Sequence, residues 1–554
     1  MEGQDGFATG PSNHQPVVDL GYEIYQAINE QDSNAAYYTF STIRYAAPPV
    51  GDLRWREPVL PEENRSVVQS DPAPIACPQG FLTWQIRSAA GVEQYLASGV
   101  VPDVSYENLT TQVSGGQEDC LFLDVLAPKA VFDHVGSGHQ VPVLVWVHGG
   151  GFTSGSKTHF GSPRGLIERG AQNETDSFIY VALNYRLGAF GFLAGNAFEK
   201  EGGLLNGGLF DQRIALQWVQ DNIHLFGGDR KQVTVLGQSS GGGSIMHHIT
   251  ADGNGIKPLF RRAILQSPSY PPYRSWLENQ EAFDSFMGLS NVTTLAQARD
   301  LPSEILVAAN ANSIGRAQPW EAPVYGPTPD KKLVLSVPNS YFRPGVFEQT
   351  VDILTGYNSN EGLLLAPFIH TNEEYEAFLY NLLPNADVST ITGIAERKSL
   401  YPPIFDGSMG YRNNYERAAL TAADVMVNCH NSDLGLCMRF RNTSAYYFSV
   451  YPGIHGQELE YTFYTTGRDT ADARLHSGVD TGPVNETLAY VLQDYIVSFV
   501  KTGKAASSLE GLVRIPRYGL TGHLARLDTS GVGLMRDPGP DGRCGWWFRG
   551  DYDW

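Results

Sequence analysis

The chain has 554 residues and a formal net charge of −20, with 59 acidic side chains against 39 lysines and arginines. Binding nucleic acid through its phosphates needs a basic face, and no run of lysine or arginine supplies one, which argues against nucleic acid as a partner. No stretch approaches the roughly 18 consecutive apolar residues of a membrane-spanning helix. Hydrophobic residues make up 42% of the chain, enough for one very large core.

Short apolar segments alternate with helical patterns along the chain. In chain order, the clear strands are expected at residues 143–147, 178–183, 233–236, 263–265 and 352–354. Apolar residues recur at helical spacing between 211 and 222 and over 488–499, which predicts two core-packing helices. This alternation is typical of an α/β fold with a mostly parallel sheet covered on both faces. Ligands of such sheets bind at the carboxyl ends of the strands.

A glycine-rich loop follows the strand at 143–147. Its sequence is His-Gly-Gly-Gly-Phe at 148–152. Glycines let the main chain approach a substrate oxygen closely, so the backbone N–H groups of Gly150 and Gly151 are candidate donors to a developing oxyanion. The alternative interpretation is a plain glycine cluster between a strand and a loop.

A second motif, Gly-Gln-Ser-Ser-Gly at 237–241, lies between the strand at 233–236 and a helical stretch. A tight turn of this kind needs glycines beside the serine and pushes the serine hydroxyl clear of the sheet. We therefore predict that Ser239 is a nucleophile and that the N–H of Ser240 is a third oxyanion donor.

A serine nucleophile on this kind of turn needs a histidine base and an acid, which follow in the chain order serine, acid, histidine. His247 and His248 are too close in sequence to reach back to Ser239. His455 and Glu361 both lie in loops at suitable places, but an isolated loop histidine or glutamate is more often a surface residue. The pattern by itself leaves these two assignments open.

The chain resembles the type-B carboxylesterase/lipase family, which includes cholinesterases and secreted fungal esterases and lipases. The stretch 226–241 matches the family's serine signature, and Glu-Asp-Cys-Leu-Phe-Leu-Asp-Val at 118–125 matches its second signature. The resemblance runs from about Tyr45 to Trp547. It implies an α/β-hydrolase fold, with a large central, mostly parallel sheet and helices on both faces, as a single domain over 1–554.

The resemblance also implies a function. It implies a serine hydrolase that cleaves small-molecule or lipid carboxylic esters through an acyl-enzyme, as a carboxylesterase or lipase, with no metal and no cofactor. One alternative is an acyl-transfer or tailoring enzyme of a biosynthetic pathway. Another is a non-catalytic adhesion-type module, although such relatives usually lack the nucleophile.

Residue by residue, the resemblance places the triad on Ser239, Glu361 and His455. It places Ser267 beside the triad carboxylate, as a hydrogen-bonding serine. Many relatives carry glutamate before the nucleophile, where this chain has Gln238. Loss of an anionic neighbour weakens the support for a cationic substrate, which argues against choline esters. Two structural ion pairs are also implied, Arg54 with Glu118 and Arg186 with Asp211.

The five cysteines are Cys77, Cys120, Cys429, Cys437 and Cys544. The resemblance implies a Cys77–Cys120 disulfide around residues 78–119, a loop like the lid of fungal lipases, with a passive surface loop as the alternative. It also implies a Cys429–Cys544 disulfide. Spacing alone does not exclude a local Cys429–Cys437 bridge.

The first residues have neither the basic nor the apolar region of a signal peptide. The paired cysteines and six glycosylation sequons nevertheless favour a secreted glycoprotein whose leader is missing from this sequence, with a cytoplasmic protein as the alternative. The sequons lie at Asn64, Asn108, Asn173, Asn291, Asn442 and Asn485. The sequence leaves the acyl chain, the alcohol and the oligomeric state open.

Overall fold

The structure is a computed structural model. It describes residues 15–28, 35–107, 115–171, 177–317, 324–342, 344–396, 400–437, 442–466, 478–509, 514–519, 521–539 and 542–548. The sequons at Asn108 and Asn173 and part of the loop 78–119 lie outside these ranges.

A ten-stranded sheet forms the centre of the fold, in the order β13-β12-β11-β10-β9-β8-β6-β7-β5-β3. Neighbouring strands are parallel from β7 across to β12, and the pairs at the two edges are antiparallel. A separate three-stranded sheet, β1-β2-β4, lies beside it. The strands are β1 (Val17–Asp19), β2 (Glu23–Gln26), β3 (Tyr37–Arg44), β4 (Asn64–Gln69), β5 (Phe122–Pro128), β6 (Val141–Val147), β7 (Ile179–Leu183), β8 (Gly228–Gln238), β9 (Arg262–Gln266), β10 (Asp352–Asn358), β11 (Thr443–Phe448), β12 (His523–Asp528) and β13 (Gly531–Arg536).

Helices fill most of the connections between these strands. They are α1 (Thr83–Ser98), α2 (Lys129–Phe132), α3 (Arg164–Gly170), α4 (Gly188–Phe192), α5 (Asn196–Lys200), α6 (Gly207–Asn222), α7 (Ser240–Thr250), α8 (Trp276–Leu289), α9 (Leu295–Arg299), α10 (Ser303–Gly315), α11 (Pro338–Phe342), α12 (Asn372–Leu382), α13 (Val388–Ala395), α14 (Asn414–Ala423), α15 (Cys429–Cys437), α16 (Glu458–Thr462), α17 (Glu486–Thr502) and α18 (Arg543–Trp547).

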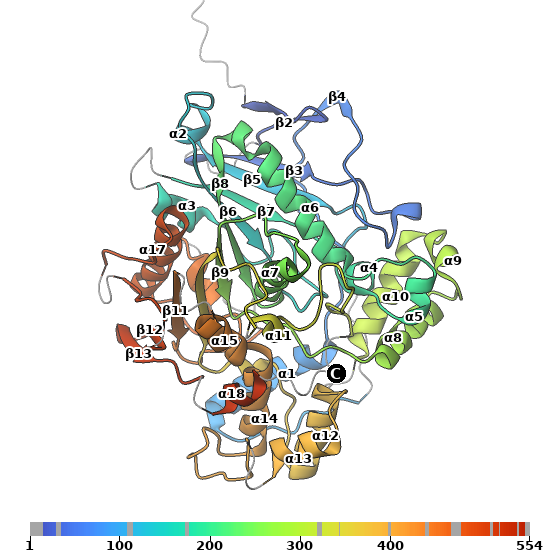
Figure 1. The fold of residues 1–554 in the computed structure, drawn as a ribbon, viewed down its shortest axis with the longest axis vertical. Coiled ribbons are helices and arrows are strands. Elements are labelled where there is room, and N and C mark those ends of the chain that lie inside the picture. Colours follow the sequence, from blue (N-terminus) through green and yellow to red (C-terminus); the bar gives the residue numbers. More distant parts are fainter. Residues whose placement is uncertain are drawn as a thin grey trace, which may run out of the picture.

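The central sheet is covered on both faces, and strand β6 shows why its sequence is apolar throughout. Val143, Val145 and Val147 point into one core cluster, which α6 and α7 complete. Leu144 and Trp146 point the other way, into a second cluster to which α17 contributes many residues. The helices α6, α7 and α17 are labelled beside the sheet in Figure 1. Side chains alternate along a strand, so a strand buried on both faces is apolar at every position. The predicted α/β-hydrolase architecture is confirmed.

The predicted elements are in the right places but their bounds differ. The strand expected at 233–236 extends over Gly228–Gln238, and the one expected at 352–354 extends to Asn358. The strand expected from Phe178 begins one residue later, and the helix of 488–499 spans Glu486–Thr502. Glycine and polar residues at strand ends still pair in the ladder, because backbone hydrogen bonds do not depend on apolar side chains.

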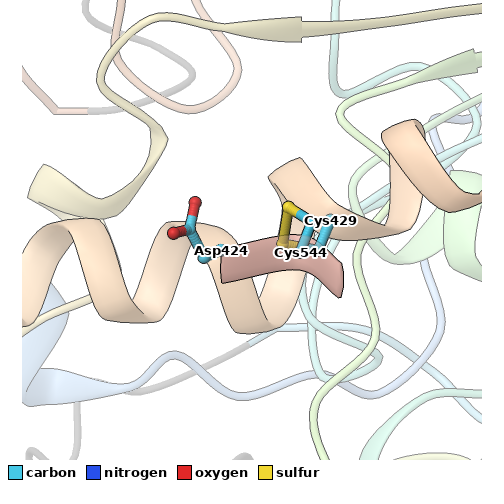
Figure 2. Close-up of side chains that lie close together, drawn as sticks. All are labelled: Asp424, Cys429 and Cys544. Atoms are coloured by element: carbon cyan, nitrogen blue, oxygen red, sulfur yellow. A yellow bond between two sulfur atoms is a disulfide. The ribbon is translucent and has the colours of Figure 1, made fainter. Parts of the chain in front are cut away.

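Both disulfides implied by the resemblance are present, Cys77–Cys120 and Cys429–Cys544. The second joins α15 to α18, so the local alternative with Cys437 is not formed. Asp424 lies beside this bridge (Figure 2). Because the two sulfurs are bonded to each other, the trio has no thiolate to offer a metal ion.

The implied ion pairs are also present. Arg54 Nε lies 2.7 Å from Glu118 Oε2, and Arg186 Nε lies 2.7 Å from Asp211 Oδ2, all of them buried. Among the helices of the described residues, none is both long and apolar enough to cross a bilayer.

Candidate active site

The predicted nucleophile elbow lies where β8 ends and α7 begins. Ser239, between them, has φ 54° and ψ −126°, a conformation that side chains rarely adopt. A Cβ atom at Gly241 would come within 2.1 Å of the Val147 carbonyl oxygen, and one at Gly237 within 2.6 Å of the Gly241 backbone. The flanking glycines are therefore required, and the packing around them holds the serine in a strained turn.

The structure brings Ser239, His455 and Glu361 together. His455 Nε2 lies 2.8 Å from Ser239 Oγ, and His455 Nδ1 lies 2.5 Å from Glu361 Oε2. Ser239 follows β8, Glu361 follows β10 and His455 follows β11. These strands are close neighbours in the sheet order. With Nδ1–H donating to the carboxylate, Nε2 is free to accept the serine proton.

The surroundings of His455 favour its protonated form. Burial lowers the pKa of His455, but the neighbouring Glu361 carboxylate raises it, and the net shift is upward. The Glu361 side chain is fully buried, so its charge is poorly screened by water. An imidazolium formed during a reaction is thus stabilised where it forms.

A second carboxylate, that of Glu458 at the start of α16, lies behind the first. Ser267 Oγ is 2.6 Å from Glu361 Oε1 and 2.8 Å from Glu458 Oε1. The single hydroxyl proton serves only one of them, so a protonated Glu458 can donate to Ser267 while Ser267 donates to Glu361. Burial and the charge of Glu361 raise the pKa of Glu458 to about 7, which fits this arrangement.

Glu458 was not among the site residues predicted from the sequence. Its only signal was its place three residues after His455. Asn358 also belongs to this cluster: its N–H donates to Glu361 and its side-chain amide to Glu458. Ser267 lies where the resemblance places it, beside the Glu361 carboxylate.

The glycine loop after β6 lies against the elbow. Gly150 and Gly151 have φ 113° and 63°, and a Cβ at Gly149 would come within 3.1 Å of Ser239 Cβ. Ser154 N donates to the Gly150 carbonyl oxygen over 3.0 Å, which closes the loop. Within the part of the chain that the structure describes, the N–H groups of Gly150, Gly151 and Ser240 donate to no protein acceptor. All three backbone donors thus remain available for a ligand.

Gln238 lies between the glycine loop and the histidine loop. A Cβ at Gly149 would come within 2.8 Å of Gln238 Oε1, and one at Gly456 within 3.6 Å of Gln238 Nε2. Gln238 is buried, and its Nε2 has no partner among the described residues. A neutral donor therefore stands where a glutamate would place a negative charge.

Comparisons with known proteins show the family of the chain. The sequence model of the carboxylesterase family matches residues 25–525. The chain is 37% identical to carboxylesterase patB of Aspergillus clavatus, over 98% of this chain and 97% of that protein. It is 32% identical to a secreted lipase of Arthroderma benhamiae, over 68% of this chain and 71% of that protein.

Among solved structures, EstA of Aspergillus niger superposes with a TM-score of 0.77 at 24% identity. The match covers 97% of this chain and 98% of that one, and supports the fold. The family match spans most of the chain and the patB relative covers nearly all of it. The chain therefore belongs to the carboxylesterase family and is a carboxylic-ester hydrolase.

Proposed function

We propose that the protein hydrolyses carboxylic esters through an acyl-enzyme formed on Ser239, with His455 as general base and Glu361 as the acid that orients it. The observation that carries this proposal is the continuous hydrogen-bonded line from Ser239 Oγ through the imidazole to a buried carboxylate. The N–H groups of Gly150, Gly151 and Ser240 serve as the oxyanion hole.

In the first half-reaction, Ser239 Oγ attacks the ester carbonyl carbon and its proton passes to His455 Nε2. The carbonyl oxygen becomes an oxyanion, which the three N–H groups stabilise. The bond to the alcohol breaks and the alcohol leaves with the proton from His455. In the second half-reaction, water gives a proton to His455 and attacks the acyl carbon. The bond from that carbon to Ser239 Oγ then breaks, Oγ takes the proton back from His455, and the acid is released.

The substrate we propose is an uncharged small-molecule or lipid ester. Gln238 supplies no negative charge beside the nucleophile, so a cationic alcohol would be held less well than beside a glutamate. We also propose that residues 78–119, within a single domain of 1–554, act as a lid. Helix α1 packs on the residues that follow Glu361 in the chain. Its Tyr95 hydroxyl lies 2.5 Å from Glu416 Oε1.

The experiment is a chain-length series of p-nitrophenyl esters, from acetyl to palmitoyl, together with labelling by a fluorophosphonate. We expect turnover of at least one ester and a single label on Ser239, both absent from Ser239→Ala. No turnover across the series, with Ser239 unlabelled, would favour a non-catalytic module. Labelling without hydrolysis, but with transfer to an added alcohol, would favour an acyl-transfer enzyme.

We further propose that the protein is a secreted glycoprotein. The lipase of Arthroderma benhamiae is named as secreted, and two disulfides are typical of oxidising compartments. Asn64, Asn291 and Asn485 are exposed. The Asn442 side-chain amide instead donates to the Gly503 carbonyl, so we expect little glycan there. Glycopeptide mapping of protein from a secreting host tests this, and unoccupied exposed sequons would contradict it.

A further inference from the structure

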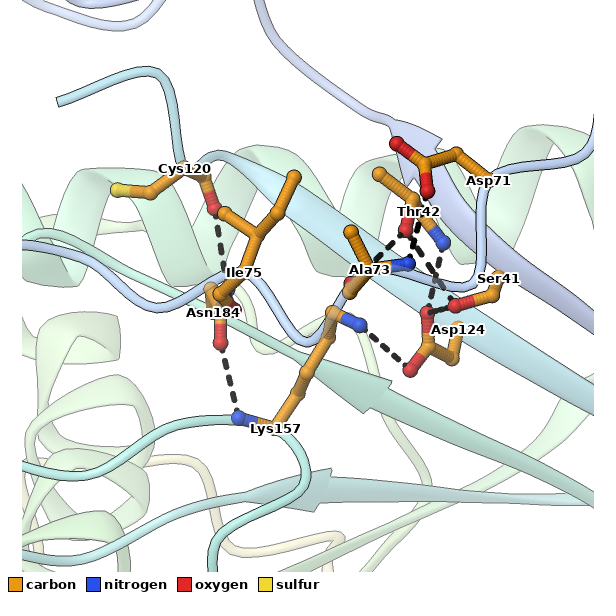
Figure 3. A network of polar contacts seen from close by, with 9 residues as sticks. All are labelled: Ser41, Thr42, Asp71, Ala73, Ile75, Cys120, Asp124, Lys157 and Asn184. Atoms are coloured by element: carbon orange, nitrogen blue, oxygen red, sulfur yellow. Dashed lines mark hydrogen bonds and ion pairs between the residues drawn. The ribbon is translucent and has the colours of Figure 1, made fainter. Parts of the chain in front are cut away.

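A buried polar network lies where the glycine loop rejoins the body of the protein (Figure 3). Lys157, six residues after Gly151, is 4% exposed. Its Nζ donates to Asp124 Oδ2 of β5 over 2.6 Å, and the two side chains are only 1% and 8% exposed. A lysine and an aspartate are thus almost fully removed from water at the end of the loop that carries the oxyanion donors.

The other oxygen of Asp124 is held by β3. Asp124 Oδ1 accepts from Ser41 Oγ over 2.9 Å and from Thr42 N over 2.8 Å. The pairing of β3 with β5 shifts register between Phe40 and Ile43, and Thr42 has φ 56°, a strained value for a β-branched residue. The shift points the Thr42 N–H at the carboxylate instead of along the ladder, and this contact helps to hold the strained conformation.

Asn184, just after β7, makes a second connection. Its Oδ1 accepts from Lys157 N over 2.8 Å. Its Nδ2 donates to the carbonyl oxygens of Ile75 and Cys120, at 2.8 and 3.2 Å. The loop that follows β6 is also tied directly to the start of the disulfide loop, because Gly80 N donates to the Thr153 carbonyl oxygen. The oxyanion loop and the base of the disulfide loop therefore form one hydrogen-bonded unit.

Stability alone does not account for this ion pair. Removing a lysine and an aspartate from water costs several kcal/mol for each ion, and well-packed apolar residues of similar size are often as stable. What the charged pair adds is a defined direction and length for one hydrogen bond. Such a constraint matters most at Gly151, because a Cβ there would find no atom within 4 Å, so close packing does not fix this position of the loop.

We propose that Lys157 and Asn184 are positioning residues for the oxyanion hole. Lys157, paired with Asp124, fixes the end of the loop to the sheet, and Asn184 fixes it to the base of the disulfide loop. Neither touches the substrate. They act by holding the N–H groups of Gly150 and Gly151 where the oxyanion forms, a geometry that tolerates displacements of only about 0.5 Å. The inference rests on the oxyanion hole proposed above.

The test compares Asp124→Asn/Lys157→Met with the wild type. The double change leaves no unpaired buried charge, and the amide oxygen of the new side chain can still accept from Ser41 and Thr42. We expect kcat per titrated active site to fall about 10- to 100-fold with KM nearly unchanged. The affinity for a trifluoromethyl ketone, whose adduct with the serine forms the same oxyanion, should fall in the same proportion. Asn184→Ala, which leaves the ion pair intact, should act in the same direction.

The control is Arg169→Met/Asp494→Asn, which removes a partly buried ion pair between α3 and α17. We expect a comparable change in melting temperature and no change in kcat. The proposal is overturned if folded Asp124→Asn/Lys157→Met and Asn184→Ala keep the wild-type kcat and ketone affinity. The proposal is equally overturned if these variants differ from the wild type only in the fraction of active sites that can be titrated, with kcat per titrated site unchanged. An inactive wild type would instead contradict the proposed function, since the inference concerns only the ratio of variant to wild type.

Discussion

Glu361 and Glu458 are two buried carboxylates joined through a single hydroxyl group, that of Ser267. One of them lies against the imidazole of His455, whereas the other lies beyond the hydroxyl and has a pKa raised to about 7 by burial and by its neighbour's charge. The same residue type therefore has two different electrostatic roles within one cluster.

Replacing these two glutamates should separate their roles. Glu361→Gln removes the partner of His455 Nδ1–H, and we expect kcat to fall about 10⁴-fold. Glu458→Gln keeps a neutral donor beside Ser267 and should lower kcat by less than about tenfold. Steady-state rates of the two folded variants on one p-nitrophenyl ester provide the comparison. Equal losses would show that our distinction is wrong.

Glu458→Gln should also move the pH profile. As the pH rises through about 7, Glu458 ionises in the wild type, and its charge helps to raise the pKa of His455. The glutamine carries no charge, so the pKa of His455 should be lower in the variant. Because kcat/KM requires the neutral imidazole, its acid limb should shift to lower pH. A profile from pH 5 to 9 measures this, and a shift upward would contradict it.

Gly150 and Gly151, the two glycines of the proposed oxyanion hole, offer a matched pair of variants. A Cβ at Gly150 would lie 2.2 Å from the Ser154 carbonyl oxygen, whereas one at Gly151 would meet nothing within 4 Å. Gly150→Ala should therefore displace the loop and lower kcat about 10²- to 10³-fold, the usual effect of losing one donor. Gly151→Ala is strained only by the φ of 63° at this position, so its kcat should fall much less. Similar losses for both would argue against the steric reason.

Buried histidines should make the fold sensitive to acid. Burial lowers the pKa of His247 and His430 to about 3 and that of His148 to about 4. The unfolded chain takes up these protons below about pH 6.5 and the folded protein does not. The stability they contribute is thus complete above pH 6.5 and is lost as the pH falls from there towards 4.

Urea unfolding at pH 7.5 and 5.0 measures this effect. Neither ring nitrogen of His247 has a partner among the described residues, so His247→Phe removes a titrating group without removing a hydrogen bond. Between pH 7.5 and 5.0, the free energy of unfolding should fall less in the variant than in the wild type. We expect the two decreases to differ by on the order of 2 kcal/mol. An unchanged difference would show that His247 is not held neutral.

The C-terminal disulfide should stabilise the fold strongly. Cys429 and Cys544 are separated by 115 positions, and a cross-link of this length restricts the unfolded chain by about 4 to 5 kcal/mol in the chain-entropy model. Cys429→Ser/Cys544→Ser should therefore lower the melting temperature markedly, with Cys437→Ser as a control of small effect. Calorimetry compares them, and equal melting temperatures would contradict the expectation.

The sequence and the resemblance predicted which residues meet at the candidate site, but not the contacts that hold them there. The turns at 148–152 and 237–241 were legible because strained backbone next to a strand needs glycine. Glu361 and His455 needed the family resemblance, since a loop carboxylate or imidazole has no local signature. Glu458 and the contact between Lys157 and Asp124 were missed because they join residues that only the folded sheet brings together. An aspartate inside the apolar strand β5 was the one visible signal, since aspartate is unfavourable in strands.

The three residues of the proposed triad lie after β8, after β10 and in the loop after β11, whereas long helical insertions occupy the chain between them. The shared sheet sets their relative positions, and of the insertions α14 packs on the turn that carries Glu361. Insertions that do not pack on these turns can therefore change by mutation, lengthening or replacement while Ser239, Glu361 and His455 stay in register. Selectivity and reactivity in this molecule are, for that reason, separately evolvable traits.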